Sequence, residues 1–112
     1  MKGSHLGELE ELVLLMVGVL HPRAYGVSVM DELERQAGRS LNISAIHAVM
    51  TRLEEKGLVK SLMSDPTDVR GGRRKRIFIL TASGRRTLDE TMSLRSALYS
   101  KIPTVAFHLK IA

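Results

Sequence analysis

The periodicity of this sequence changes at Gly57, and that change restricts the fold more than any other feature. Over residues 42–56, apolar side chains recur every three or four positions, as on one face of a helix. They are Ile46, Met50 and Leu53. Residues 58–63 and 76–80 are rich in β-prone side chains and flank a loop of turn-forming and charged residues. The pattern predicts a helix followed by a two-stranded hairpin.

Two further helical segments precede this unit and one follows it. Residues 6–20 have an acidic first turn and then an apolar run, and residues 24–37 carry a helical pattern that Gly38 ends. The last helix starts after a cap at Thr81 or Ser83. The sequence therefore predicts a mainly α fold with a small β-hairpin (α+β). This is a winged helix-turn-helix in the order helix, helix, helix, strand, wing, strand, helix.

Size and composition exclude several other classes of protein. The chain has 112 residues, 44% of them hydrophobic and 26% charged, which fits one domain with a modest core. It contains no Cys, which excludes disulfide frameworks, thiolate zinc sites and thiol catalysis. Its longest apolar run, residues 12–20, is shorter than the span of about 20 residues that crosses a membrane. We expect a cytoplasmic protein with no membrane partner.

The positive charge is concentrated in the middle of the chain. The formal net charge is +5, to which residues 1–38 contribute −3, residues 39–86 contribute +7 and residues 87–112 contribute +1. A concentrated positive field favours a polyanionic partner, with nucleic acid first.

The hairpin loop has the densest charge, since residues 70–76 hold five cations and two glycines. Glycine lets the backbone approach another surface closely, and the cations can then face a phosphate backbone or enter a minor groove. We predict that this whole segment contacts DNA: Arg70, Gly71, Gly72, Arg73, Arg74, Lys75 and Arg76.

The helix predicted at residues 42–56 is the natural partner of this loop. With its apolar residues turned inward, small and hydrogen-bonding side chains occupy its other faces and suit a major groove. They are Ser44, His47, Ala48, Thr51 and Arg52. Two interpretations of His47 stay open: a contact with a phosphate or base edge, and a half-buried ring that packs beside the second helix.

The residues form no pattern typical of a catalytic or cofactor site. The histidines lie in unrelated segments, no Ser lies in a nucleophile elbow, and neither Gly-rich stretch has phosphate-loop spacing. No His or carboxylate follows His47 by one helical turn, so a metal site is not expected. We predict no enzyme, no cofactor and no metal.

Three pieces of the sequence resemble the PadR family of bacterial transcriptional regulators. They are Ala24-Tyr25-Gly26, the run from Thr51 to Val59 and the run from Gly71 to Arg85. Where the family's recognition helix usually reads Gly-Thr-Leu-Tyr-Pro, this chain has Ser44-Ala45-Ile46-His47-Ala48, so His47 replaces a Tyr. The resemblance implies DNA binding, with Tyr25 as a further contact, by a homodimer that represses by covering a promoter.

The resemblance is to short family members, which dimerise mainly through their first and last helices. Residues 12–20 are apolar on all sides and the last helix has an apolar face, and a C2 dimer would bury both. Such a dimer places two recognition helices about one DNA turn, roughly 34 Å, apart on a pseudo-palindromic operator. The alternative is that the first helix is the central core element of one chain. The predicted interface comprises Leu9, Leu12, Val13, Met16, Leu88, Met92, Leu94, Leu98 and Tyr99.

We expect residues 1–86 to form the DNA-binding domain and residues 87–112 a dimerisation helix and tail. The alternation of Val105, Phe107, Leu109 and Ile111 suits a strand. A disordered tail and a continued helix are equally compatible with this segment.

Two other hypotheses stay open. In the first, the chain is a winged-helix protein-interaction module whose basic wing docks on an acidic partner. In the second, the regulator also binds a small-molecule effector, as relatives in the family do. Because Tyr25, Tyr99, Phe78 and Phe107 are the only aromatic residues, the sequence does not favour a stacked aromatic ligand.

Overall fold

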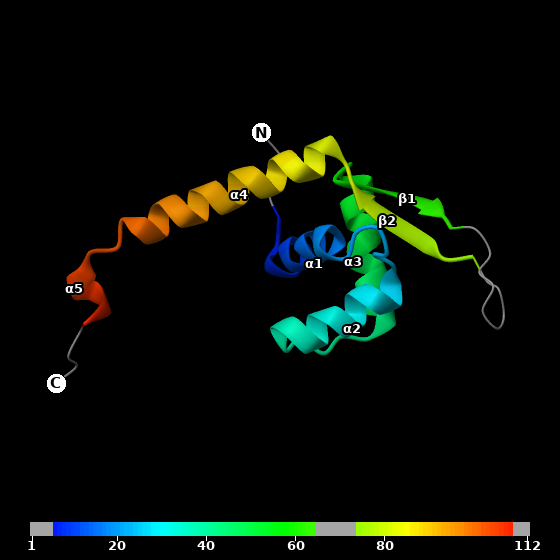
Figure 1. Cartoon of the computed structure of the whole chain (residues 1–112), viewed down its shortest axis with the longest axis horizontal. Coiled ribbons are helices and arrows are strands. Elements are labelled where there is room, and N and C mark those ends of the chain that lie inside the picture. Colours follow the sequence, from blue (N-terminus) through cyan, green and yellow to red (C-terminus); the bar gives the residue numbers. More distant parts are fainter. Residues whose placement is uncertain (1–5, 65–73, 109–112) are drawn as a thin grey trace.

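The computed structural model describes residues 6–64 and 74–108. Within these residues the chain runs α1 (Glu8–Val19), α2 (Gly26–Ala37), α3 (Ile43–Glu55), β1 (Val59–Met63), β2 (Arg76–Leu80), α4 (Ala82–Ser100) and α5 (Thr104–Phe107). The two strands form one antiparallel sheet (Figure 1). The predicted mainly α fold with a small hairpin is confirmed, and so is the order of its elements.

Local signals determine where the helices begin and end. The Asn42 side chain accepts a hydrogen bond of 2.8 Å from a backbone N–H in the first turn of α3. Thr81 caps α4 in the same way, at 3.0 Å. Gly38 and Gly57 follow α2 and α3 with φ of 66° and 77°, a left-handed conformation that glycine adopts without steric cost.

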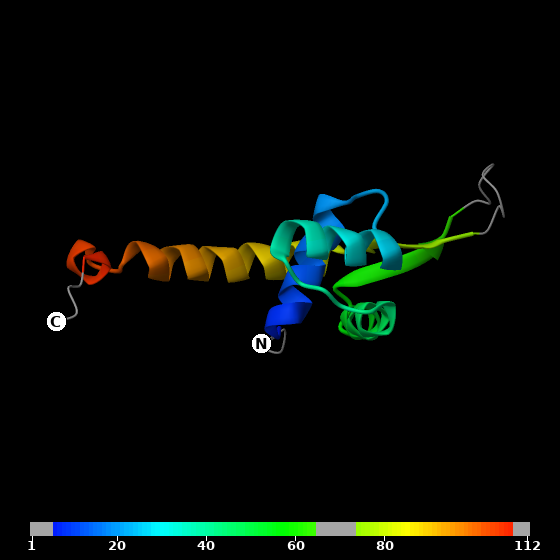
Figure 2. The same ribbon diagram turned by 90° about the horizontal axis from the view of Figure 1, so that it is seen from below.

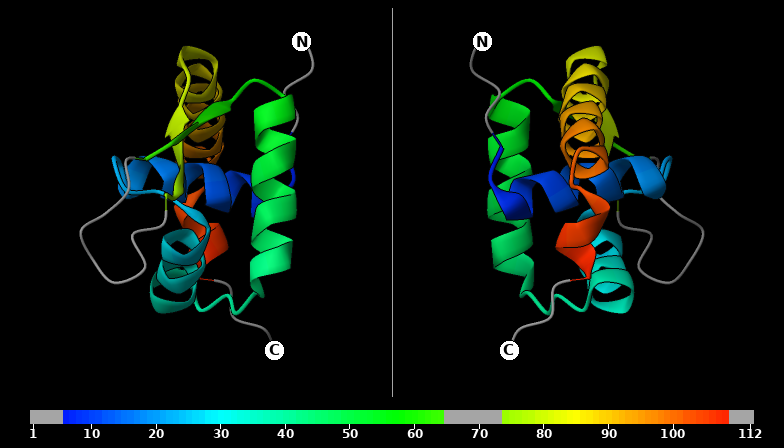
Figure 3. Two further views of the ribbon diagram at one scale, coloured as in Figure 1. Left: turned by 90° about the vertical axis from the view of Figure 1, so that its right-hand side faces the viewer. Right: turned by 90° about the vertical axis from the view of Figure 1, so that its left-hand side faces the viewer.

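The helix α1 lies at the centre of the core. It packs against α2, α3, β2 and α4, and Figure 3 shows it crossing α3. The buried side chains of the other elements surround it. They are Val29 and Leu33 of α2, Ile46, Val49, Met50 and Leu53 of α3, Leu58 and Val59 at the start of the hairpin, Phe78 of β2 and Leu88 of α4.

This core buries much of the apolar surface of α1, contrary to the prediction that one domain could not. Val13 is fully buried within the chain, so the prediction that it contacts a second copy is wrong. Met16 and Leu88, at 7% and 8% exposed, belong to the same core and leave little surface to a partner. An all-round apolar helix is what a central position requires, which is the alternative that the sequence left open.

The hairpin is tied to the segment that precedes α2. Val59 lies opposite Leu80 and Met63 opposite Arg76 in the antiparallel register. The Phe78 N–H donates to the carbonyl of Ala24 at 2.8 Å, and the Phe78 side chain enters the core. The hairpin therefore runs beside the beginning of α2 and points away from α4 (Figure 2).

The helix α4 is anchored at its first turn and then leaves the domain (Figures 1 and 2). The Thr81 N–H donates to the carbonyl of Leu58 at 3.1 Å, and its hydroxyl donates to the carbonyl of Gly57 at 2.7 Å. The molecule measures 61 × 33 × 20 Å as a result. Across residues 6–64 and 74–108, no helix is both long and apolar enough to cross a membrane.

After α4 the chain forms a single helical turn. The strand interpretation is therefore wrong for residues 104–107, which form α5. Its preceding residue, Pro103, has a φ of −67°, which is suited to the start of a helix. The Tyr99 and Phe107 rings then contact each other, with 5.8 Å between their centroids. Leu109 and Ile111 lie outside the described residues.

Candidate nucleic-acid interface

The helix α3 has one buried face and one exposed polar face. Ile46 and Leu53 are fully buried against α1 and α2, because apolar residues recur along α3 with the helical period. The opposite face presents short and hydrogen-bonding groups to solvent. All five residues predicted to contact DNA from this helix are exposed: Ser44, His47, Ala48, Thr51 and Arg52.

His47 lies on this exposed face and also borders α2. A Cβ atom placed on Gly26 would lie 2.9 Å from His47 Cε1 and 3.0 Å from its Nε2. The imidazole therefore packs against the first turn of α2, where glycine leaves room for it. The packing interpretation of His47 is right about this neighbour and wrong about burial, since the residue is exposed.

Tyr25 joins the start of α2 to the end of the hairpin loop. Its N–H donates to Ser28 Oγ at 2.9 Å, and the same hydroxyl donates to the carbonyl of Arg23 at 2.8 Å. The ammonium group of Lys75 lies 4.6 Å from the centroid of the Tyr25 ring, within the range of a cation–π interaction. Tyr25, Lys75 and His47 are thus all placed around the first turn of α2.

Part of the predicted wing can be placed. Arg74, Lys75 and Arg76 are exposed at the start of β2. Arg70, Gly71, Gly72 and Arg73 lie outside the described residues.

Arg76 has partners within the chain. Its Nη2 lies 3.1 Å from Glu54 Oε1 on α3, and its Nε donates to Ser61 Oγ at 3.1 Å. The guanidinium carbon also lies 5.6 Å from the centroid of the Phe78 ring. Arg76 therefore connects the hairpin to α3. A DNA phosphate that binds Arg76 has to compete with Glu54 for its guanidinium group.

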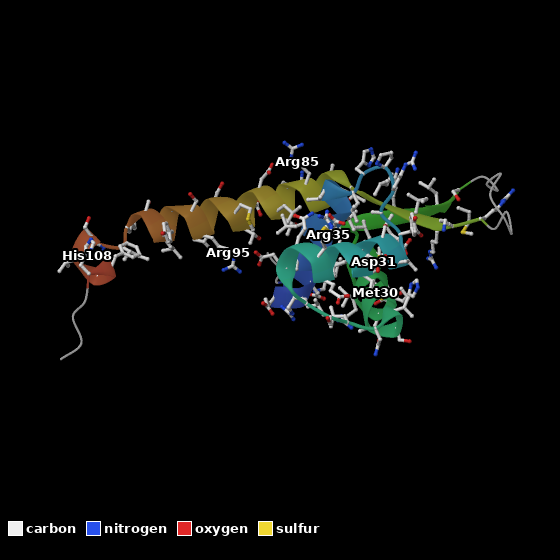
Figure 4. The ribbon with its side chains drawn as sticks, turned by 60° about the horizontal axis from the view of Figure 1, so that its bottom comes forward. Met30, Asp31, Arg35, Arg85, Arg95 and His108 are labelled. Carbon is white, nitrogen blue, oxygen red and sulfur yellow. The ribbon has the colours of Figure 1, made fainter. Side chains whose placement is uncertain are left out.

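The acidic first turn of α1 contacts three other parts of the structure. Glu8 binds Arg39 in the α2–α3 connection, with 2.9 Å between Oε2 and Nη1. Glu11 binds Arg95 of α4 at 2.8 Å, and Figure 4 shows Arg95 and Arg85 projecting from opposite sides of that helix. The hydrogen bonds that Arg95 donates to Glu11 raise the pKa of Arg95.

Glu10 is the third of these acids and binds α3 and the residue that caps its C-terminus. Its carboxylate accepts from Lys56 Nζ at 2.9 Å and from Arg52 Nε at 3.3 Å. Burial alone raises the pKa of Glu10, but hydrogen bonds from Lys56, Gly7 and Arg52, together with the charge of Lys56, hold it below its usual value. Glu10 therefore stays ionised next to α3.

Sequence reasoning missed this cluster. It explained the three acids by the dipole of α1, which is a local effect, and their partners lie 31, 46 and 84 residues further along the chain. A surplus of acids in one helical turn of a basic protein was the available signal. Within the described ranges, no group of three or more His, Cys, Asp or Glu is placed to hold a metal ion.

The remaining predicted interface residues form a gradient of exposure along α1 and α4. Leu9, Leu12 and Met92 are half-buried. Further along α4, Leu94, Leu98 and Tyr99 are 60%, 57% and 66% exposed. The predicted interface residues that remain available to a partner therefore lie mainly on the far half of α4.

A helix with an exposed face of short polar side chains, beside a two-stranded hairpin, is the arrangement of the winged-helix class of DNA-binding regulators. Residues 14–90 of the chain match the Transcriptional regulator PadR-like family. The chain belongs to this family, whose members are DNA-binding transcription regulators and not enzymes.

Solved structures of PadR regulators share the fold. The PadR family transcriptional regulator from Eggerthella lenta is 27% identical over 83% of this chain and 80% of its own, with a TM-score of 0.62. A PadR family regulator from Clostridium difficile is 22% identical over 84% of this chain and 93% of its own, with a TM-score of 0.65. A PadR-like regulator from Bacillus cereus is 16% identical over 93% of both chains, with a TM-score of 0.70. No curated protein sequence matches this chain.

Proposed function

We propose that this PadR-like regulator is a homodimeric repressor that inserts α3 into the major groove of a pseudo-palindromic operator. The observation that carries the proposal is the division of α3 into a buried apolar face and an exposed face of short polar and basic residues. A recognition helix needs that division, because it must pack on its domain and read base edges at the same time. Such a repressor acts in the cytoplasm.

The hairpin loop supplies the second DNA contact in this proposal. Arg74 and Lys75 are exposed at its end, and Lys75 is held beside the start of α2 by the Tyr25 ring. Residues 70–76 then lie against the phosphate backbone or in a minor groove. Tyr25 and His47 add contacts near the first turn of α2.

Dimerisation uses the far half of α4 in this proposal. Leu94, Leu98 and Tyr99 are large apolar side chains that are more than half exposed on this part of the helix, as residues of an interaction site are. We assign residues 1–86 to DNA binding and residues 87–112 to dimerisation. The boundary falls inside α4, so one continuous helix connects the two parts.

A small effector has a candidate site among the described residues. A hollow of about 340 Å³ is lined by Val17, Gly18, His21, Ile79 and Leu80. Its volume is at the lower end of the range of about 300–1,000 Å³ that ligand pockets have. Since no Phe, Tyr or Trp is among these lining residues, a small aliphatic effector suits the hollow better than a stacked aromatic drug.

The proposal is tested first by DNA binding. Random duplexes are selected with the wild-type protein, and affinity for the enriched sequence is measured as a function of salt by fluorescence anisotropy. Arg74→Gln should weaken binding to all duplexes and reduce the slope of log K against log salt by about 0.9 for each lost contact, or about 1.8 for a dimer that loses one contact in each protomer. Lys101→Gln makes the same change of charge beyond the end of α4 and should leave the slope unchanged. Equal slopes for Arg74→Gln and the wild type would count against the wing contact.

Sedimentation measures the proposed dimer. The double substitution of Leu94→Glu and Leu98→Glu should give a folded monomer, because neither side chain belongs to the core. Val19→Glu changes a side chain that is 63% exposed on α1 and should remain dimeric. A wild-type monomer at micromolar concentration would contradict the assembly.

The alternative function is a protein-interaction module whose basic wing binds an acidic protein. The exposed cations Arg74 and Lys75 favour it as well. It predicts that no duplex is enriched over random sequence, so the selection experiment separates the two functions.

A further inference from the structure

Glu10 is the one charged residue in the described part of the chain that is buried, with 8% of its surface exposed. It lies in the first turn of α1, on an element that is not part of the proposed DNA-binding surface. A buried carboxylate is costly unless it is fully hydrogen-bonded or paired. Its partners therefore indicate what the residue is for.

Both oxygens of Glu10 have partners. Oε1 accepts from the Gly7 N–H at 2.9 Å, which caps α1, and from Lys56 Nζ at 2.9 Å. Oε2 accepts from the same Nζ at 3.1 Å and from Arg52 Nε at 3.3 Å. The cap and Lys56 already neutralise the buried carboxylate, so stability alone does not require Arg52.

Arg52 contacts Glu10 through its Nε group alone. Within residues 6–64 and 74–108, its two Nη groups donate to no other residue. The Arg52 side chain remains 52% exposed on the proposed DNA-binding face. A guanidinium is a rigid planar fork, so holding Nε also fixes the direction in which both Nη groups point.

We propose that Glu10 is a positioning residue for DNA binding: by holding Arg52 Nε, it directs the two Nη groups of Arg52 toward a DNA phosphate. This inference rests on the proposed function. Two Nη groups that point in one direction can bind a phosphate bidentately, and part of the conformational entropy of the arginine is lost before the DNA arrives. Glu10 does this from inside the protein, without touching DNA.

A charge argument makes the opposite prediction. Removing one negative charge from a DNA-binding protein raises its affinity for every duplex. A positioning role predicts that Glu10→Gln lowers affinity although the net charge becomes more positive. The sign of the change therefore distinguishes the two.

The chain offers a matched control on the same helical turn. Glu8→Gln removes the same charge, but the Glu8 side chain is 75% exposed and its partner, Arg39, is not on α3. We expect Glu8→Gln to bind the selected duplex as tightly as the wild type or more tightly. We expect Glu10→Gln to bind the selected duplex about fivefold more weakly. A change of this size corresponds to the loss of one well-placed charge-assisted hydrogen bond.

A double-mutant cycle separates positioning from a general loss of structure. In an Arg52→Ala background, Glu10→Gln should no longer weaken binding and should bind as tightly as Arg52→Ala alone or more tightly, whereas a purely structural role of Glu10 gives the same loss in both backgrounds. Circular dichroism at the assay temperature checks that each variant is folded. If Glu10→Gln does not fold, Arg52→Lys replaces it, because lysine keeps the charge but lacks the fork and should bind about fivefold more weakly.

The outcomes are distinguishable. If the wild-type protein enriches no duplex, the proposed function fails and this inference fails with it. If the wild type binds its selected duplex and Glu10→Gln binds as tightly as Glu8→Gln, the positioning role is wrong and the function stands. Unchanged binding by Arg52→Lys has the same meaning.

Discussion

Gly84 marks the closest contact between α4 and the hairpin. A Cβ atom placed on this residue would lie 2.1 Å from the carbonyl oxygen of Leu58, and contacts under 3.0 Å do not occur. The obstacle is backbone, which cannot rotate away as the end of a side chain can. Gly84→Ala therefore requires α4 and the start of β1 to separate by about 1 Å in a tightly packed region.

Two opposing effects determine the size of the change. Overpacking costs typically about 1–3 kcal/mol, and a contact with backbone belongs at the upper end. Alanine is a better helix former than glycine by up to about 1 kcal/mol. We expect Gly84→Ala to lower the free energy of unfolding by about 2 kcal/mol and the Tm by roughly 8 °C.

Circular dichroism melts measure this, with all proteins at one concentration because association raises the Tm. Gly18→Ala is the matched control: it makes the same chemical change in α1, but its closest neighbour is Leu80 Cδ1 at 3.2 Å, the end of a flexible side chain. It should melt at or above the wild-type temperature. If Gly84→Ala proves as stable as Gly18→Ala, the close contact between α4 and the hairpin is wrong.

The remaining predictions concern the core, the ionised Glu10 and the first turn of α2. Leu53→Ala should lose about 2–5 kcal/mol in denaturant unfolding, since Leu53 is fully buried, whereas Val19→Ala should change stability by no more than about 0.5 kcal/mol. Because the pKa of Glu10 is lowered in the folded state, its contribution to stability is present above the unfolded pKa and is lost as the pH falls through the folded pKa. The Tm difference between the wild type and Glu10→Gln should therefore shrink from neutral pH towards acid pH, and a constant difference would rule out the ion pairs as its cause. Gly26→Ala should displace the His47 ring and weaken binding to the selected duplex by roughly 1 kcal/mol in anisotropy titrations, with a smaller effect on the Tm than Gly84→Ala.

Features that depend on neighbouring residues could be predicted from the sequence. The stops at Gly38 and Gly57, and the cap at Thr81, one of two residues that the sequence offered, follow from backbone hydrogen bonds and torsion angles within a single turn. The exposed face of α3 could also be predicted, because the helical spacing of its apolar residues determines which side chains face solvent. Each of these needs only a few consecutive residues.

Features that depend on what surrounds an element could not be predicted. The pattern of α1 indicates that Val13 is buried, but the partner, this chain or a second copy, depends on how four other elements pack around it. The tail shows the same limit, since alternation around Val105 suits a strand only when another strand is available to pair with it. Glu10 and Lys56 are 46 residues apart, and only the fold brings them together.

The root of α4 has a consequence for the geometry of any assembly built on this helix. Thr81 bonds to the carbonyls of Gly57 and Leu58, which follow the end of α3, and Arg95 bonds to Glu11 further along α4. These contacts determine the angle between α4 and α3 inside each protomer. In the proposed dimer, the separation of the two copies of α3 is then set by the fold of each chain and repeated by symmetry. Substitutions far from both DNA and partner would therefore change which operator spacing fits.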